Sequence, residues 1–324
     1  MIPDAAAVLA AFGLPGEPVD VAEVAGGWSN AVWRVGTADG SYAVKALRNA
    51  WGEPRWLEWL AEAWRVERAA LTAGIPMPEP LVVPGADGCV AWVEGVPVRV
   101  HRWVESSVVP REPVGADLAR WVGGAVAGVH ALALRPMQPD LYDSRTGLTT
   151  SEHWPALVGR ARALGAGWAD ELAASLPFAQ RASALLEPWD DADAVLVHAD
   201  VDQKNLLVSR AGPLLIDWDV VVPAVPSHDL AHAALTMGSW RDPAAARAVL
   251  EGYADVTGAR PRLRPADLGP ALASRLGWIR FTADRALDAV EAGTDVGTPD
   301  LPALLADLEH RVAVAEQLPA WLHP

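Results

Sequence analysis

Two apolar runs that each end in acidic side chains constrain this 324-residue chain more than any other feature. The first apolar run leads into the segment that holds Asp200 and Asn205, and the second leads into Asp217. Because apolar residues flank both acidic clusters, each cluster is expected at the edge of a buried β-segment. Polar groups held there are either hydrogen-bonded structural residues or parts of a site. We therefore expect residues 194–222 to form a strand–loop–strand segment that carries the chemistry.

The spacing within this segment suits phosphoryl transfer. One carboxylate must orient the attacking hydroxyl and accept its proton, and an amide oxygen five residues later can share Mg²⁺ with a second carboxylate. Asp200, Asn205 and Asp217 match this pattern, with Asp217 twelve residues after Asn205 and three apolar residues before Asp217. We therefore expect Asp200 to be catalytic and Asn205 and Asp217 to bind the metal. His198 is expected to pack beneath the loop.

The use of lysine indicates a phosphate site elsewhere in the chain. Only two of the 26 basic residues are lysines, Lys45 and Lys204. Lys45 lies in an otherwise apolar strand pattern, where a charge needs a partner, and its compact ammonium suits phosphate oxygens. Helical spacing places Glu67 on the buried face of the following helix, so Glu67, rather than Glu62, is expected to pair with Lys45. Lys204 is better explained as a solvated loop charge than as a functional residue.

A glycine-rich turn between two expected strands is suited to cover the phosphates. Its sequence runs from Ala25 to Asn30 as AGGWSN. Glycines let the backbone approach a phosphate, and short polar side chains add donors. We therefore expect nucleotide contacts from Gly26, Gly27, Ser29 and Asn30.

The first hundred residues are expected to be mostly strands, and the rest mostly helices. The expected strands are 19–26, 31–36, 41–47, 79–83, 89–94 and 96–104, with helices at 3–12 and 55–73. A linker-like stretch at 106–107 and 110–113 then leads into helices at 114–134, 151–164, 169–186, 226–237, 243–256, 265–292 and 301–317. This is an α+β plan. It predicts a small antiparallel-sheet lobe at residues 1–105 and a larger, mostly helical lobe at 106–324.

Composition argues against several classes of protein. The net charge of −15 disfavours a nucleic-acid partner. The N-terminus lacks the basic region of a signal peptide, and the notable uncharged stretch 121–134 is shorter than the roughly 20 residues of a membrane helix. A cytoplasmic protein without a membrane partner is expected. The single cysteine, Cys89, lies in an apolar run and is expected to be a buried structural thiol.

In these motifs the chain resembles the aminoglycoside phosphotransferase family, which is the phosphotransferase enzyme family in the choline-kinase-like branch of the protein-kinase-like fold. The matching segments are 26–30, 42–47, 67–80, 198–207, 214–219 and 227–231. The resemblance implies a bilobal kinase fold, Asp200 as the catalytic residue and Asn205 and Asp217 as Mg²⁺ ligands. It also implies that adenine docks on the backbone of Arg102, Trp103 and Val104.

The chain departs from the family pattern at several positions of the site. Ala199 stands where the family often has Gly, and Asp202 where it often has His. Asp219 replaces the Gly of the protein-kinase D-F-G motif, and the sequence has no A-P-E motif, so a protein kinase is disfavoured. These patterns leave the roles of Asp202, Lys204 and Asp219 open.

The expected activity is that of an ATP-dependent small-molecule kinase, a phosphotransferase with an alcohol group as acceptor. ATP is the expected phosphoryl donor, with GTP as the alternative, and Mg²⁺ the expected metal. The acceptor is expected to be an aminoglycoside or another hydroxylated antibiotic-like molecule, which implies antibiotic resistance; a metabolic alcohol such as homoserine, choline or a sugar is the alternative. A non-catalytic nucleotide-binding regulatory protein is the third hypothesis, against which the intact Lys45, Asp200, Asn205 and Asp217 argue. The motifs define neither the acceptor nor the oligomeric state.

Overall fold

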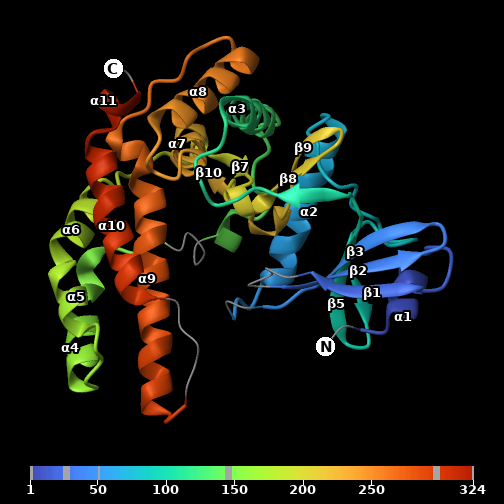
Figure 1. The fold of residues 1–324 in the computed structure, drawn as a ribbon, viewed down its shortest axis with the longest axis horizontal. Helices are drawn as coiled ribbons and strands as arrows, with labels where there is room; N and C mark the ends of the chain where they lie inside the picture. The colour runs from blue at the N-terminus through green and yellow to red at the C-terminus, as the bar shows by residue number, and fades with distance from the viewer. Residues whose placement is uncertain (1–2, 25–29, 50–51, 143–147, 295–299, 323–324) are drawn as a thin grey trace. The chain divides into compact units, whose positions relative to one another are not determined.

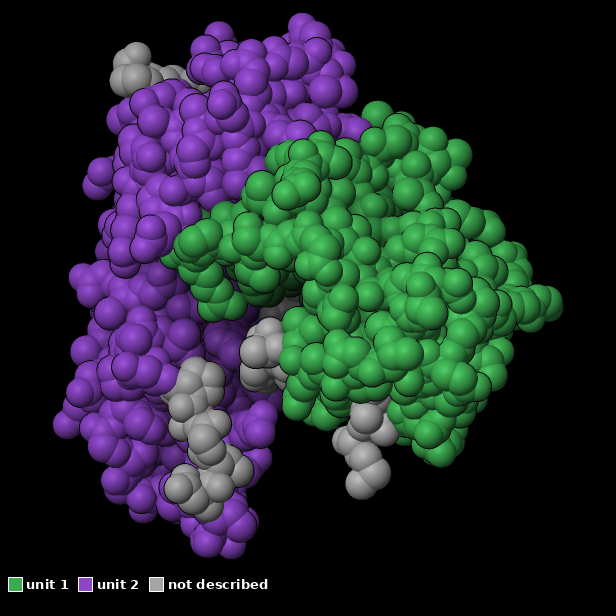
Figure 2. Space-filling view, turned by 45° about the vertical axis from the view of Figure 1, so that its right-hand side comes forward, with its two compact units in different colours: residues 1–111, 131–137, 198–221 green, residues 112–130, 138–197, 222–324 purple. Residues whose placement is uncertain are grey.

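The computed structural model describes residues 3–24, 30–49, 52–142, 148–294 and 300–322. The chain divides into two compact units (Figure 2). Unit 1 contains residues 1–111, 131–137 and 198–221, and unit 2 contains 112–130, 138–197 and 222–324. Contacts thus group the segment 198–221 with the N-terminal residues. The division into a nucleotide-binding lobe at 1–105 and a helical lobe with the acceptor site at 106–324 stays a prediction.

Unit 1 is built around a five-stranded antiparallel sheet (Figure 1). Its strand order is β1-β2-β3-β5-β4. The strands are β1 (Asp20–Val24), β2 (Ala31–Thr37), β3 (Gly40–Ala46), β4 (Ala91–Val93) and β5 (Val96–Arg102). Helix α1 (Ala5–Ala11) contributes Val8 and Leu9 to the apolar core on one face of this sheet.

The two faces of β3 and β5 differ because side chains alternate along a strand. Val44 of β3 and Val98 and Val100 of β5 belong to the apolar core shared with α1. The intervening residues therefore point to the opposite face, and among them Lys45 lies directly across from Arg99 in the strand register. This second face, called the charged face below, carries Lys45 and Arg99.

Helix α2 (Trp56–Thr72) contributes side chains to the charged face. It covers nearly the whole of the predicted helix 55–73, and it ends before Gly74, whose φ of 82° suits a residue without a side chain. Both glutamates considered for pairing, Glu62 and Glu67, are buried. Position in the helix alone therefore does not distinguish them.

A second, three-stranded sheet of unit 1 holds the segment predicted to carry the chemistry. It consists of β6 (Ser106–Val108), β8 (Leu206–Ser209) and β9 (Gly212–Leu215), in the order β6-β8-β9. The short 3₁₀ helices η4 (Gln203–Asn205) and η5 (Trp218–Val220) precede β8 and follow β9. The predicted linker at 106–107 is therefore wrong, because β8 pairs with this exposed segment, whose polar side chains carry no hydrophobic signal.

The predicted strand at 79–83 is also absent from the described strands. The segment makes an isolated bridge between Pro80 and His101, and the Leu81 N–H donates to the Val100 carbonyl. Proline has no N–H to donate to a strand ladder, so pairing here stays local.

Unit 2 combines a two-stranded sheet with helices. Strand β7 (Val195–Val197) pairs with β10 (Val222–Ala224). The helices are α3 (Ala116–Ala131), α4 (Trp154–Ala163), α5 (Ala169–Ala174), α6 (Leu176–Ala184), α7 (Pro226–Met237), α8 (Pro243–Thr257), α9 (Gly269–Glu291), α10 (Leu301–Glu316) and α11 (Leu318–Leu322). α3 runs one residue beyond the unit boundary. The helix predicted at 169–186 is two helices, because Pro177 lacks the N–H that a continuous helix needs. Within the described part of the chain, no helix combines the length and the apolar composition that crossing a membrane requires.

Candidate active site

His198 fixes the start of the loop that carries Asp200. Its Nδ1 accepts a hydrogen bond from the Asp200 N–H at 3.3 Å, so Nε2 carries the proton and donates to the Ile216 carbonyl at 3.0 Å. The ring is buried and packs edge-on against Trp218. The packing role predicted for His198 is confirmed. Ala199, between His198 and Asp200, has a φ of 63°.

The Asp200 carboxylate is held at both oxygens. Asn205 donates from Nδ2 to the backbone carbonyl and to Oδ2 of Asp200, each at 2.8 Å. Lys204 donates from Nζ to Oδ1 at 2.9 Å. Burial lowers the pKa of Lys204, but the carboxylates of Asp200 and Asp202 outweigh burial and raise it above its ordinary value. Asp200 thus sits beside a fixed positive charge while its side chain remains partly exposed.

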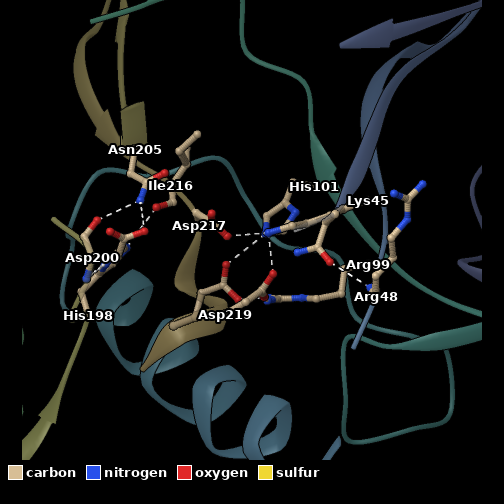
Figure 3. Close-up of polar contacts among 12 residues, drawn as sticks. Lys45, Arg48, Arg99, His101, His198, Asp200, Asn205, Ile216, Asp217 and Asp219 are labelled. Atoms are coloured by element: carbon tan, nitrogen blue, oxygen red, sulfur yellow. Dashed lines mark hydrogen bonds and ion pairs between the residues drawn. The ribbon is translucent and has the colours of Figure 1, made fainter. Parts of the chain in front are cut away.

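One backbone hydrogen bond places Asp217 next to this loop. The Ile216 N–H donates to the Asn205 carbonyl at 3.0 Å, so the end of β9 runs beside η4. Asp217 itself adopts the left-handed conformation, with φ 66° and ψ 56°, as the chain turns into η5. Its Oδ1 accepts from Lys45 Nζ at 2.5 Å (Figure 3). The fold therefore gathers four predicted site residues, from β3, the loop and η4, and the end of β9.

Asn205 and Asp217 have the chemistry of a Mg²⁺ site. Magnesium prefers oxygen ligands and is bound by one or two carboxylates together with substrate phosphates and water. The Nδ2 of Asn205 is engaged by Asp200, so its amide presents the oxygen to other ligands. The described residues contain no group of three His, Cys, Asp or Glu side chains arranged for a metal. A site completed by phosphates and water does not need one.

Lys45 is a permanent cation in this site. Its Nζ contacts Asp217 and Asp219. Burial lowers the pKa of Lys45, but the two carboxylates outweigh burial and raise the pKa well above its ordinary value of 10.5. Lys45 is therefore charged at neutral pH, as its predicted contact with phosphates requires.

Glu67 is buried as predicted, but its partners differ from the prediction. Its carboxylate binds Arg99 and lies 3.0 Å from Nε2 of His101. Among the described contacts, the carboxylates on Lys45 are those of Asp217 and Asp219. The expected ion pair between Lys45 and Glu67 is replaced by an indirect connection, because Arg99 binds both Glu67 and Asp219.

Arg99 and Asp219 are the residues whose place in the site the sequence did not reveal. A signal for Arg99 existed, because it interrupts an apolar strand between Val98 and Val100 just as Lys45 interrupts β3. The reasoning applied to Lys45 therefore applies to Arg99 as well. Asp219 gave no comparable signal, since its neighbours in the sequence do not indicate which cation it meets.

The remaining predicted nucleotide contacts are partly outside the described residues. Gly26, Gly27 and Ser29 lie there. Asn30 is buried, and its Oδ1 accepts from the backbone N–H of Arg48 at 2.9 Å, so it ties the chain before β2 to the chain after β3.

The segment predicted to bind adenine begins at Arg102, the last residue of β5, and includes the two residues that follow it. The N–H groups of Arg102 and Trp103 donate to the carbonyls of Glu79 and Ser41, both at 2.9 Å. An adenine contact here would therefore fall to the neighbouring Val104 or to carbonyl groups, and it stays a prediction. Cys89 is buried as expected, and burial raises the pKa of its thiol to about 11.

Comparison with known proteins gives one family and a consistent fold. The model of the phosphotransferase enzyme family matches residues 20–266. A spectinomycin phosphotransferase in complex with ADP and spectinomycin is 13% identical, with 91% of this chain and 94% of that chain covered, at a TM-score of 0.61. An amicoumacin kinase with AMP-PNP and Ca²⁺ is 13% identical, with 93% and 90% covered, at 0.60. An ethanolamine kinase of Plasmodium vivax is 12% identical, with 95% and 86% covered, at 0.57.

No curated protein sequence matches this chain. The solved structures confirm the predicted α+β, kinase-like fold.

Proposed function

Because the chain belongs to the phosphotransferase enzyme family, we propose that it transfers the γ-phosphoryl group of ATP to a hydroxyl group of a small molecule. The observation that carries the proposal is the hydrogen bond from the Ile216 N–H to the Asn205 carbonyl. It sets Asp217, the carboxylate that we propose binds the metal, beside the loop that holds Asp200. Phosphoryl transfer depends mainly on such positioning and on electrostatic stabilisation.

Asp200 is the proposed catalytic residue. Its carboxylate orients the acceptor hydroxyl and takes its proton as the oxygen attacks the γ-phosphorus. The new phosphorus–oxygen bond forms while the bond to the β-phosphate oxygen breaks, which leaves a phosphate ester and ADP. Hydrogen bonds from Lys204 and Asn205 hold the carboxylate in one orientation for this step.

Lys45, Asn205 and Asp217 are the proposed groups for the nucleotide. The Lys45 ammonium neutralises phosphate charge, and the oxygens of Asn205 and Asp217 hold Mg²⁺. When bound, Mg²⁺ supplies positive charge against the β- and γ-phosphate oxygens. The nucleotides ADP and AMP-PNP in the spectinomycin phosphotransferase and the amicoumacin kinase support ATP as the donor, with GTP as the alternative.

We propose a hydroxylated antibiotic-like acceptor, such as an aminoglycoside. Two similar structures, a spectinomycin phosphotransferase and an amicoumacin kinase, support this class and a role in antibiotic resistance. The ethanolamine kinase supports the alternative of a metabolic alcohol. We further propose a cytoplasmic enzyme that binds neither nucleic acid, as the net charge of −15 suggests, nor membranes.

The test is Mg²⁺-dependent release of ADP from ATP across a panel of aminoglycosides, other hydroxylated antibiotics and metabolic alcohols. One acceptor class should stimulate release in the wild type. Asp200→Ala should lose stimulation by roughly a thousandfold while it still binds nucleotide, because the loss falls on positioning and proton transfer. Retained turnover in Asp200→Ala would contradict the role of Asp200.

Asp202→Asn is the matched control in the same loop. Asp202 accepts from the Lys204 N–H through Oδ1, a contact that an asparagine oxygen preserves. We expect this variant to keep turnover within about tenfold of wild type, because the Asp200 carboxylate stays in place. Nucleotide binding without stimulation by any acceptor would favour the non-catalytic regulatory protein, and no nucleotide binding would overturn the proposal.

A further inference from the structure

The sheet of unit 1 places two cations directly opposite each other. Lys45 of β3 and Arg99 of β5 are partners in the antiparallel register. The side chain of Arg99 is 1% exposed and that of Lys45 is 14% exposed. Like charges at facing positions repel, and burial strengthens the repulsion. This arrangement therefore requires carboxylates that the two cations share.

Asp219 is the carboxylate that both cations share. Its Oδ2 accepts from Lys45 Nζ, and its Oδ1 accepts from Nη1 of Arg99 (Figure 3). Burial raises the pKa of Asp219, but Lys45 and Arg99 outweigh burial and hold the pKa well below its ordinary value. Asp219 is therefore ionised, and each of its two carboxylate oxygens binds one of these cations.

The second arm of the Arg99 guanidinium reaches helix α2. Its Nη2 donates to Oε2 of Glu67, whose Oε1 lies 3.0 Å from Nε2 of His101. The contacts form a continuous chain from Lys45 through Asp219 and Arg99 to Glu67. A planar guanidinium can bind two carboxylates from different elements with a fixed angle between them, which a flexible ammonium does not provide.

We propose that Arg99 is a positioning residue of the nucleotide site. It ties Glu67 of α2 to Asp219 of η5, and through Asp219 it holds Lys45 and the adjoining Asp217 in place. The inference rests on the proposed function, in which Lys45 and Asp217 bind the nucleotide and its metal. Glu67 thus orients Lys45 through Arg99 and Asp219.

Stability alone does not account for this arrangement. Buried ionic groups lose hydration, and apolar residues of similar volume often give equal or greater stability. The chain instead keeps a fully buried arginine whose two arms bind elements more than a hundred residues apart in sequence, Glu67 and Asp219. What these bonds provide is the relative position of α2, η5 and Lys45.

The test compares two charge-balanced double variants on the same helix. E67Q/R99Q removes one buried charge of each sign and breaks the connection, yet leaves Lys45 with Asp217 and Asp219. E62Q/R65Q is the control, because Glu62 and Arg65 form another ion pair on α2 with a buried glutamate and do not contact Lys45, Arg99 or Asp219 in the described contacts. Each protein is titrated with Mg²⁺ and a non-hydrolysable ATP analogue, and its Tm and its KM for ATP are measured.

We expect E67Q/R99Q to weaken Mg²⁺-nucleotide binding and to raise KM for ATP by about tenfold or more, because small displacements of binding groups are costly. E62Q/R65Q should stay within about twofold of wild type even where its Tm falls. R99K keeps the positive charge but loses the planar guanidinium that binds two carboxylates. Its affinity for Mg²⁺-nucleotide should lie between those of wild type and E67Q/R99Q. It also serves as the second test if E67Q/R99Q does not fold.

Two results would overturn the inference while the proposed function stands. One is wild-type affinity in folded E67Q/R99Q or, if that variant does not fold, in R99K. The other is an equal loss in both double variants, which would indicate general loosening of α2. If the wild type itself binds no Mg²⁺-nucleotide, the proposed function fails and the inference falls with it.

Discussion

At the scale of single residues, two positions of the proposed site carry backbone strain, as do Glu94, Ala133, Ser239 and Trp240 elsewhere among the described residues. Ala199 and Asp217 both adopt left-handed conformations, with φ of 63° and 66°. For a residue with a Cβ this costs about 1–2 kcal/mol and persists only where surrounding bonds enforce it. Here the bonds from His198 to Ile216 and from Ile216 to Asn205 enforce it.

Strain at Ala199 predicts an unusual response to glycine. Ala199→Gly should leave the free energy of unfolding unchanged or raise it by up to about 1 kcal/mol, because relief of strain offsets the greater entropy of the unfolded chain. Ala61→Gly, on the exposed face of α2, should lower it by about 1 kcal/mol. Urea unfolding of both variants is the measurement. Equal losses in the two would show that Ala199 is unstrained.

The carboxylates bound by Arg99 also predict an acid-dependent stability. Burial raises the pKa of Glu67, but Arg99 and His101 outweigh it and leave the pKa below its ordinary value of 4.5. A carboxylate with a depressed pKa in the folded state stabilises above its unfolded-state pKa, and this stabilisation is lost as pH falls through the folded-state pKa.

The difference in free energy of unfolding between wild type and E67Q/R99Q should therefore shrink as pH falls from about 5 to about 2. Urea titrations across this range measure it. A difference that is independent of pH would show that ionised Glu67 contributes nothing to stability.

At the scale of elements, α3 and α8 cross with their backbones in contact. A Cβ built on Gly123 would lie 1.9 Å from the Val249 carbonyl oxygen, and one on Gly252 would lie 1.8 Å from that of Arg120. Glycine at both positions therefore sets how closely the two helices pack. The neighbouring Gly124 lies outside this close contact, with its nearest atom, on Val256, at 3.7 Å.

The adjacent glycines of α3 give a matched pair of variants. Gly123→Ala should destabilise the protein by about 1–3 kcal/mol, because the added methyl group forces the helices apart. Gly124→Ala should be neutral or stabilise by up to about 1 kcal/mol through helix propensity. Thermal unfolding distinguishes them, and similar Tm values would contradict the tight crossing.

At the scale of the whole molecule, unit 1 is assembled from three separate stretches of chain. Residues 1–111 need 198–221 to complete it, because that segment supplies Asp217, Asp219 and β8, the strand that pairs with β6. Removing one partner of a buried ion pair costs about 3–5 kcal/mol. That loss is comparable with the roughly 5–15 kcal/mol by which whole proteins are stable.

A fragment of residues 1–105 is therefore expected not to fold alone, since Lys45 and Arg99 lose the carboxylate they share. Circular dichroism during urea unfolding, compared with the full chain, is the measurement. A cooperative transition in the fragment would show that the first 105 residues form an independent domain.

Local patterns were sufficient for much of the fold and for part of the site. Alternation identified β2, β3 and β5, and helical spacing identified α2 and most later helices. The predicted roles of Asp200, Asn205 and Asp217 came from one motif, because neighbouring residues on a short loop and strand stay together in the fold. Strand β6 was not predicted, because its two serines resemble a linker. It forms a strand only by pairing with β8, about a hundred residues away in the sequence.

The spacing of Asp200, Asn205 and Asp217 and the rarity of lysine were enough to predict the kind of chemistry. Which charges meet became evident from the fold alone. Lys45 binds Asp217 and Asp219, and Glu67 binds Arg99, because partners of buried ions are set by strand register and by elements distant in sequence. Electrostatic pairing acts through space, so the order of residues along the chain does not encode it.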